Sequence, residues 1–350
     1  MKSEGRVRYH RNWIIAAQTL LGAGFLAAWL WIVDLEAVAE TLAQAKWDYV
    51  LLAGAIGVAS TVIRAMRWGL ILRPVAQIPR LDVWLISIAS SLINFVIPIR
   101  SGELARGLFL KQKHGVPISA SLPTVAVDRS LDLLAVLVVG AFGAVIGLTM
   151  EGPILLVLLL GAGLIIAFFA FVLLAIFSQD RLMPLVERLV PRSFGKRFRG
   201  RLLSILNGLL IGFASIGRRP RSLIPIVALT FGSTILDATL FYMLFLSIGA
   251  VISPLVVLTG YALFVITFIV PGAPGYIGSM EAFGSLVFGA LGVGAAVAAS
   301  VIVLFHALNA IILALSGGMA MWALGFRPAA AFRAVVQGEE PTSAPATPGA

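Results

Sequence analysis

The stretch "NFVIPIRSGELARG", residues 94–107, decides how this chain folds, because it interrupts a long apolar run with charges and helix breakers. The breakers are Pro98 and Gly102, and the charges are Arg100, Glu103 and Arg106. Proline removes a backbone donor from a helix, and glycine weakens helical conformation. A single continuous helix is therefore not expected here, although the residues before the stretch are apolar enough to lie in a membrane.

The composition is typical of a polytopic membrane protein. Hydrophobic residues make up 60% of the 350 residues and charged residues 12%, with a mean hydropathy of +1.02. A soluble domain has about 25% charged residues. There is no cysteine, and the three histidines (His10, His114, His306) are scattered, so we expect no disulfide, no metal site and no cofactor. The net charge of +10 lies mostly between apolar runs, which favours anionic lipid headgroups over nucleic acid as the partner.

Six apolar runs are long enough to cross about 30 Å of hydrocarbon, which takes about 20 residues. They are 13–33, 48–72, 124–149, 153–177, 222–248 and 295–324. The first is longer than the core of a signal peptide, so we interpret it as a retained span. Residues 326–350 lack apolar periodicity and are expected to form a disordered tail. The predicted fold class is an all-α polytopic integral membrane protein with about six full spans, in a membrane domain over residues 13–325.

The distribution of Lys and Arg predicts the orientation of these spans. The amino-terminal residues 1–12, the 73–80 loop and the segment 178–221 are basic, whereas residues 34–48 are acidic. Basic loops face the cytoplasm, so both termini are expected there. The segment 178–221 is partly amphipathic and is interpreted as a cytoplasmic linker lying on anionic lipid, rather than as a nucleic-acid module.

Two shorter runs, 83–99 and 252–271, each end in a proline. If 83–99 crossed fully, the basic "KQKH" at 111–114 would lie outside the cell. A re-entrant hairpin that turns near mid-bilayer and returns as a second half-helix removes this conflict. Irregular backbone at that depth needs protein or water around it. Full spanning stays the alternative for both runs.

The two breaks also indicate an internal repeat. "FVIPIRSG" (95–102) matches "FIVPGAPG" (268–275), with prolines 271 − 98 = 173 residues apart. The Gly-Val pairs beginning at Gly115 and Gly292 are 292 − 115 = 177 residues apart, and each precedes a basic residue, Arg129 or His306. The predicted orientations invert the copies, about 48–149 and 222–325, and inverted repeats with broken helices are a transporter architecture. Two unrelated kinks in packed helices are the alternative.

Charges within the spans are the candidate functional residues. A charge at mid-bilayer costs about 2.5 to 3.5 kcal/mol, so such residues must be paired, hydrated or near an interface. Helical spacing places Arg100, Glu103 and Arg106 on one face, and Asp128 and Asp132 on another. The alternatives are a shallow structural ion pair at 128–132 and snorkelling of Arg64, Arg67 and Trp68. Half-helix amino termini at Gly102 and near Gly275 would suit a phosphate.

Four segments together resemble one known family: "IRAMRWGLIL", "PIRSGELARGLFL" with "GVPISASLPTVAVDRSLDL", "VPGAPGYIGSMEAF", and "GVGAAVAASVIVLFHALN". The chain is similar to the transmembrane, flippase-like domain of bacterial lysylphosphatidylglycerol synthase, in its stand-alone form. The resemblance implies a bacterial cytoplasmic-membrane location and a headgroup path along Arg64, Arg67, Arg100, Glu103, Arg106, Asp128, Arg129, Asp132 and Glu281. We add His306 to this predicted path. It implies hairpin turns at Pro98, Gly102, Pro271, Pro274, Gly275 and Gly278.

Two features depart from the family pattern. No aminoacyl-transferase domain follows residue 325, so lysyl-lipid synthesis is not assigned. His306 stands where the second repeat of the family usually carries arginine, and histidine is titratable.

The expected function is translocation of a polar phospho- or glycolipid between leaflets, without enzymatic activity. No P-loop is present, so movement would be downhill or coupled to an ion or proton. A membrane-embedded headgroup transferase is the less favoured alternative, because no GxSxG or HExxH motif and no Asp-rich metal motif occurs. A non-catalytic partner of a separately encoded lipid-modifying enzyme is another alternative, and the chain could form a homo-oligomer.

Overall fold

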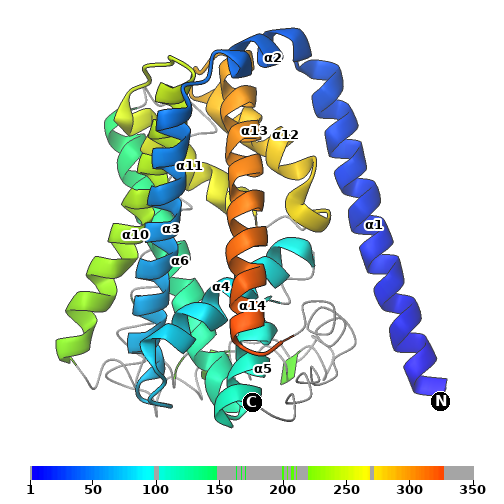
Figure 1. Cartoon of the computed structure of the whole chain (residues 1–350), viewed down its shortest axis with the longest axis vertical. Helices are drawn as coiled ribbons and strands as arrows, with labels where there is room; N and C mark the ends of the chain where they lie inside the picture. Colours follow the sequence, from blue (N-terminus) through cyan, green and yellow to red (C-terminus); the bar gives the residue numbers. More distant parts are fainter. Residues whose placement is uncertain are drawn as a thin grey trace, which may run out of the picture.

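The computed structural model describes residues 2–97, 102–147, 220–268 and 272–326, with a few isolated residues between 163 and 210. Within these ranges every regular element is helical (Figure 1). Three of the described helices are long and apolar enough to cross a membrane: Trp47–Leu72, Arg221–Ser247 and Ala295–Ala323. The predicted all-α membrane class is confirmed. The predicted span 153–177, most of the linker and nearly all of the tail lie outside the described residues.

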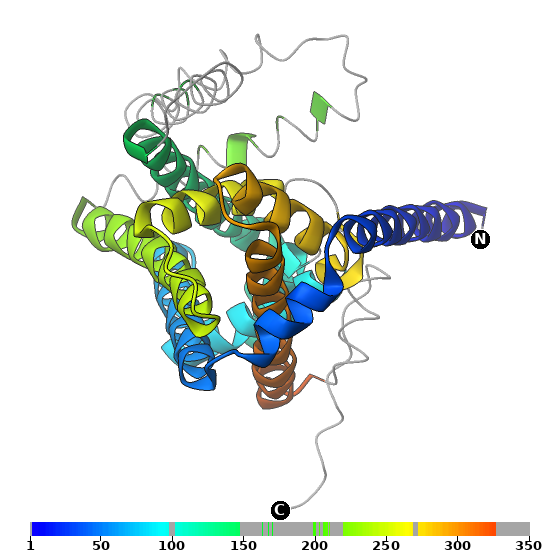
Figure 2. The ribbon, with the colours of Figure 1, turned by 90° about the horizontal axis from the view of Figure 1, so that it is seen from above.

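The described elements, in chain order, are α1 (Lys2–Ile32), α2 (Leu35–Ala43), α3 (Trp47–Leu72), α4 (Arg80–Val96), α5 (Gly102–His114), α6 (Ile118–Gly147), α10 (Pro220–Ser247), α11 (Pro254–Thr267), the 3-10 turn η1 (Pro274–Tyr276), α12 (Ser279–Ala290), α13 (Ala295–Ile312), the π turn η2 (Leu313–Gly317) and α14 (Gly318–Ala323). Seen from one end, α2 lies across the molecule between α1 and α3 (Figure 2). The chain bends by 85° between α1 and α2, where the Asp34 side chain caps α2 by accepting from the backbone N–H groups of Glu36 and Ala37.

Helices α3 and α10 form an antiparallel pair (Figure 1). Near their crossing, the Ser60 hydroxyl donates to the Ser233 carbonyl over 3.4 Å. A Cβ on Gly57 would lie 3.0 Å from Leu240 Cδ1, so the backbones approach closely there. Small residues at the crossing allow this contact, as in other membrane helix pairs.

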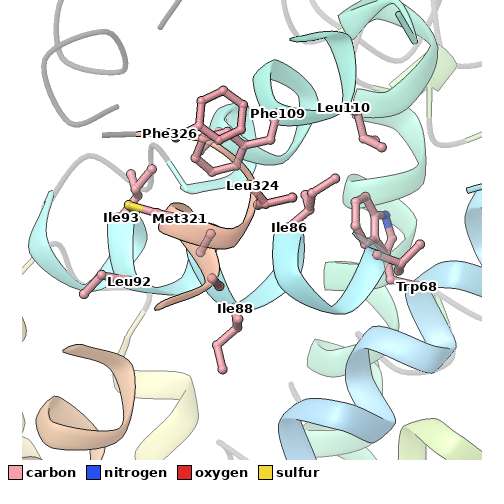
Figure 3. Close-up of a cluster of buried hydrophobic side chains, with 14 of the residues drawn as sticks. Trp68, Ile86, Ile88, Leu92, Ile93, Phe109, Leu110, Met321, Leu324 and Phe326 are labelled. Atoms are coloured by element: carbon pink, nitrogen blue, oxygen red, sulfur yellow. The ribbon is translucent and has the colours of Figure 1, made fainter. Parts of the chain in front are cut away.

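Helices α4 and α5 form the first hairpin, in the lower half of Figure 1. Asp82, near the start of α4, binds two residues at the end of α5, at the end of the hairpin away from its turn. The Asp82 carboxylate oxygens lie 3.5 Å from Lys113 Nζ and 3.0 Å from His114 Nε2. Large apolar side chains hold the hairpin against α3 and α14 (Figure 3), including Trp68, Ile86, Phe109, Leu110 and Met321. The break between the helices falls where the sequence predicts it, although residues 98–101 themselves, Pro98 and Arg100 among them, lie outside the described residues.

Helices α11 and α12 form the second hairpin, in the upper half of Figure 1. Its core is aromatic: Phe264 and Phe288 pack around Phe241 of α10, with ring centroids 5.7 and 5.8 Å from that ring. The segment after α11 contains Gly275 and Gly278, both with positive φ (70° and 82°), which glycine adopts without steric cost. Pro271 lies outside the described residues.

The end of α4 in the first hairpin contacts the turn of the second hairpin. The Phe95 ring at the end of α4 lies 6.3 Å from the Tyr276 ring and 5.9 Å from the His306 ring of α13. Two hairpins of half-length helices thus approach from opposite ends of the molecule, and the described end of α4 contacts the turn of the second.

Helix α1 contacts the rest of the described structure at the second hairpin. The indole Nε1–H of Trp29 donates to Ser285 Oγ over 3.0 Å. A Cβ on Gly278 would collide with the backbone of Gly22 and lie 2.7 Å from the Leu26 nitrogen. The first helix is therefore seated directly on the turn of this hairpin.

Candidate functional site

Two aspartates of α6 form the centre of a buried ionic network. Asp128 and Asp132 are one helical turn apart, so both side chains face α3. Arg67 of α3 binds both of them: its Nε donates to Asp128 Oδ1 over 2.8 Å, and its Nη1 lies 2.8 Å from Asp132 Oδ1. The Arg67 side chain has no exposed surface, and that of Asp128 is 2% exposed. Arg67 therefore does not snorkel to the membrane surface, contrary to one alternative from the sequence.

Arg106 of the first hairpin completes the coordination of Asp128. Its Nη1 donates to Asp128 Oδ2 over 2.9 Å, so each carboxylate oxygen accepts from a different arginine. The Arg106 guanidinium also lies 4.9 Å from the centre of the Trp68 ring, a cation–π distance. The Trp68 indole donates to Thr124 Oγ1 over 3.2 Å. The first hairpin is thereby tied to α3 and α6 by charge as well as by apolar packing.

Arg64 extends the network to α10 and α11. Its Nη1 lies 3.1 Å from Asp132 Oδ1, and its Nη2 forms an ion pair with Asp237 of α10. The Tyr261 hydroxyl of α11 donates to Asp237 Oδ2 over 2.8 Å. Sequence reasoning missed Asp237 and Tyr261. The sequence does contain an indication of Asp237, since a carboxylate in the middle of the apolar run 222–248 marks a functional position by default.

Arg129 and Glu103 form the exposed edge of the network. Arg129 Nε lies 3.4 Å from Glu103 Oε1, and Arg129 Nη1 lies 3.7 Å from Asp132 Oδ2. Their side chains are 37% and 36% exposed, against 0% for Arg67. The network therefore grades from a fully enclosed centre to an accessible pair.

The described side chains of the network are balanced in charge. Four arginines (Arg64, Arg67, Arg106, Arg129) contact four carboxylates (Glu103, Asp128, Asp132, Asp237). Mutual pairing is how such charges offset their desolvation. Apart from Arg129 and Asp132 within α6, the described pairs run between helices and not along the face of α5 that spacing indicated. Glu103 and Arg106 of α5 each bind a residue of α6.

The network lies within the length of the spans, not at their ends. At 1.5 Å per residue, Arg64 is about 26 Å from Trp47 at one end of α3 and about 12 Å from Leu72 at the other. Trp47 is exposed, as is typical of a tryptophan at a membrane interface. The charges therefore lie between the two ends of α3, closer to the end that leads into the basic 73–80 loop.

A second, separate pair lies at the turn of the second hairpin. Glu281 of α12 and His306 of α13 form an ion pair through Oε1 and Nδ1, and His306 Nε2 lies 2.8 Å from the Gly275 carbonyl oxygen. Glu281 Oε2 accepts from the Gly278 N–H over 2.8 Å. Both side chains are largely buried, at 10% and 13% exposure.

The sequence places the start of the second half-helix too early. The helix begins at Ser279, after Gly278, whereas Pro274 and Gly275 lie in the 3-10 turn before it. The Gly278 N–H at this end is occupied by the Glu281 carboxylate, so it is not free for a phosphate in this structure. In the first hairpin, the described part of α5 starts at Gly102, directly after residues that lie outside the described ranges, so the predicted start of this half-helix stays a prediction.

Comparison with known proteins covers both hairpins and both groups of charges. The family described as "Lysylphosphatidylglycerol synthase TM region" matches residues 15–317. A UPF0104 membrane protein of Pyrococcus horikoshii is 27% identical over 320 residues, which cover 86% of this chain and 94% of the relative. This chain belongs to the lysylphosphatidylglycerol synthase transmembrane-region family, a membrane-protein family linked to lipid handling.

Proposed function

We propose that this protein moves a polar lipid with a phosphate-containing headgroup between the leaflets of the bacterial cytoplasmic membrane, with both termini in the cytoplasm. One observation carries the proposal: eight ionised side chains meet inside a bundle of apolar helices, at the first hairpin. Unpaired at mid-bilayer, eight charges would cost about 20 to 28 kcal/mol, above the total stability of about 5 to 15 kcal/mol of an ordinary protein. Retaining charges at such a cost is typical of a path for a polar substrate.

The proposal includes an inverted repeat, which the offsets between the helix bounds support. Adding 173 to the bounds of α3 (47 and 72) gives 220 and 245, close to those of α10. Adding 177 to the bounds of α5 (102 and 114) gives 279 and 291, close to those of α12. The helix-ending glycines Gly115 and Gly292, also 177 apart, share positive φ values of 69° and 83°.

The contacts between α3 and α10 have the symmetry of such a repeat. Ser60 touches Ser233, its own equivalent at the offset of 173. Arg67 reaches Thr230 Oγ1 over 3.4 Å, and Gly57 approaches Leu240. Exchanging each residue for its equivalent (57 + 173 = 230 and 67 + 173 = 240) converts one contact into the other. This is the pattern of a two-fold axis passing between the two helices.

The hairpins follow the same exchange. Helix α6 of the first copy packs on α11 of the second, and α4 of the first packs on η2 and α14 of the second. We infer that both hairpins are re-entrant from opposite leaflets and that the headgroup passes where their turns meet. In transporters built this way the substrate site lies at the interface of the repeats.

The network suggests how a headgroup is bound. Its described charges sum to zero, so a phosphate would have to replace a carboxylate on an arginine instead of filling an uncompensated positive site. The Glu103 and Arg129 pair is the accessible one, and its N–O distance of 3.4 Å is longer than the 2.8 to 2.9 Å of the buried pairs of Asp128. We propose that the headgroup first displaces Glu103 from Arg129, while the acyl chains stay in the bilayer.

Reconstitution into vesicles tests the function. The purified chain in phosphatidylglycerol-containing vesicles should expose acyl-labelled fluorescent phosphatidylglycerol from the inner leaflet to external dithionite. Glu103→Gln and Arg129→Gln should each slow this exposure at least tenfold without loss of folded protein. Glu40→Gln and Lys46→Gln change exposed charges at the opposite end of the molecule and should keep the wild-type rate.

The outcomes separate transport from the alternatives. If the wild-type chain moves no labelled lipid, the transport proposal fails and a supporting role for a lipid-modifying enzyme becomes the better reading. Full rates in both Glu103→Gln and Arg129→Gln would remove this pair from the headgroup path.

A further inference from the structure

The Glu281 and His306 pair has a hydrogen-bond pattern that fixes how many protons it holds. A carbonyl oxygen only accepts, so His306 Nε2, 2.8 Å from the Gly275 carbonyl, must carry a hydrogen. The contact between Nδ1 and Glu281 Oε1 holds one further proton, on either atom, because a carboxylate and a bare imidazole nitrogen are both acceptors. The pair is therefore neutral as a unit, with one exchangeable proton between two side chains.

This pair corresponds to a permanently charged pair in the first copy. His306 is equivalent to Arg129 at the offset of 177 (306 − 129), and each binds a carboxylate of the preceding half-helix, Glu281 or Glu103. Arginine does not lose its proton in proteins, whereas histidine exchanges its proton near neutral pH. Of two equivalent positions, the structure makes one a fixed charge and the other a titratable one.

No other described charge competes for His306. The other charged groups on described helices packed against α13 are paired elsewhere or exposed. Asp237 pairs with Arg64, Arg67 with Asp128 and Asp132, and Asp82 with Lys113 and His114. The exposed ones are Glu36 and Glu40 on α2, Asp48 on α3, Arg80 on α4 and Arg221 on α10. Besides Glu281, His306 contacts the Phe95 ring and the Gly275 carbonyl.

The pair also holds the turn of the second hairpin in place. It fixes the Gly275 carbonyl from one side and the Gly278 N–H from the other. Between them, Tyr276 has a φ of 57°, which a non-glycine residue adopts only when its surroundings impose it. A second proton on the pair would convert the Glu281 carboxylate into a neutral acid, removing the charge that binds His306 and weakening its bond to Gly278.

We propose that Glu281 and His306 form a proton-binding site that couples movement of the second hairpin to proton transfer across the membrane. The site takes up a proton from water on one side when the hairpin turn is released, and returns it to water on the other side after the turn closes. The inference rests on the proposed lipid transport and names its coupling ion. The first hairpin, with its Arg129, carries no exchangeable proton at the equivalent position.

A pH gradient across reconstituted vesicles tests this proposal. With the membrane potential clamped by potassium and valinomycin, the wild-type chain should distribute acyl-labelled phosphatidylglycerol unequally between leaflets. For one proton per lipid, the leaflet ratio should change tenfold per pH unit of gradient. His306→Arg, which copies the fixed charge of Arg129, should still move lipid but give equal leaflets at every gradient. His114→Gln alters a histidine at the open end of the first hairpin and should keep the wild-type bias.

The wild-type measurement is decisive without any variant. Lipid movement with equal leaflets under a gradient would overturn the proton site and leave the transport function standing. Absence of lipid movement would overturn both. A His306→Arg protein that retains the tenfold bias would place the coupling proton elsewhere.

Discussion

The Asp128 carboxylate is the residue whose loss should most damage the fold, and the magnitude follows from its partners. Asp128→Asn keeps the shape of the side chain but removes the only described anion bound directly to Arg106, and one of two bound to Arg67. Removing one partner of a buried pair costs about 3 to 5 kcal/mol, because a charge is left uncompensated. That is a fifth or more of a typical total stability of about 5 to 15 kcal/mol.

The matched comparison is the exposed pair of the same network. Glu103→Gln breaks an ion pair whose side chains are more than a third exposed, and pairs of that kind contribute about 0 to 1 kcal/mol. We expect the free energy of unfolding, measured by SDS titration in mixed micelles, to fall by about 3 to 5 kcal/mol for Asp128→Asn and by less than about 1 kcal/mol for Glu103→Gln.

A double substitution tests the cause. Arg106→Leu with Asp128→Asn removes the cation that the single variant strands, so the pair should cost less than the sum of the two single variants by about 0.5 to 3 kcal/mol. Additive costs, or an Asp128→Asn protein as stable as Glu103→Gln, would refute the reasoning. Either result would mean that Arg106 is hydrated and does not depend on Asp128.

Three further predictions concern the second hairpin and its neighbours. Gly278→Ala should destabilise the protein by more than about 1 kcal/mol, because φ is +82° and the added Cβ would collide with Gly22. The control Gly289→Ala, in the same hairpin, meets no atom within 4 Å and should be neutral or stabilising. Thermal unfolding in detergent compares the two variants, and equal unfolding midpoints would contradict the packing. Gly275→Ala should slow lipid movement in the dithionite assay, since φ is +70° at the carbonyl that binds His306; a wild-type rate would indicate a plain kink. Asp237→Asn should also slow lipid movement by weakening the link from Arg64 to Tyr261, and an unchanged rate would exclude this residue from the path.

The sequence predicts the features that depend on local pattern. Apolar length predicts the long helices, and the Pro and Gly residues predict the two breaks near residues 98 and 271. The spacing of Asp128 and Asp132 places both on one helix face, as the structure has it, with Arg67 between them.

Local sequence pattern could not predict which charged residues pair between helices of the bundle. Helical spacing suggested that Arg106 would pair with Glu103 three residues away, but burial brings Asp128 closer, and an enclosed arginine binds the carboxylate that is enclosed with it. Asp237 and Tyr261 reach Arg64 only because α10 and α11 pack beside α3, which no spacing within one helix can indicate. Arg64 and Asp237 are also 173 residues apart (237 − 64), the offset between Pro98 and Pro271, so the proposed repeat would make them equivalent positions.

The packing of α1 on the hairpin turn leaves no room for a side chain on Gly22 or on Gly278: a Cβ on Gly278 would collide with the Gly22 carbonyl oxygen, and a Cβ on Gly22 would collide with Ala273 Cβ. If the hairpin turn moved while α1 stayed in place, two bare backbones would separate and lipid tails would fill the gap, with loss of close packing on both sides. The amino-terminal helix must therefore travel with the hairpin. A movement of the hairpin turn would then displace the far end of α1 as well, and a spectroscopic label at that end could detect it.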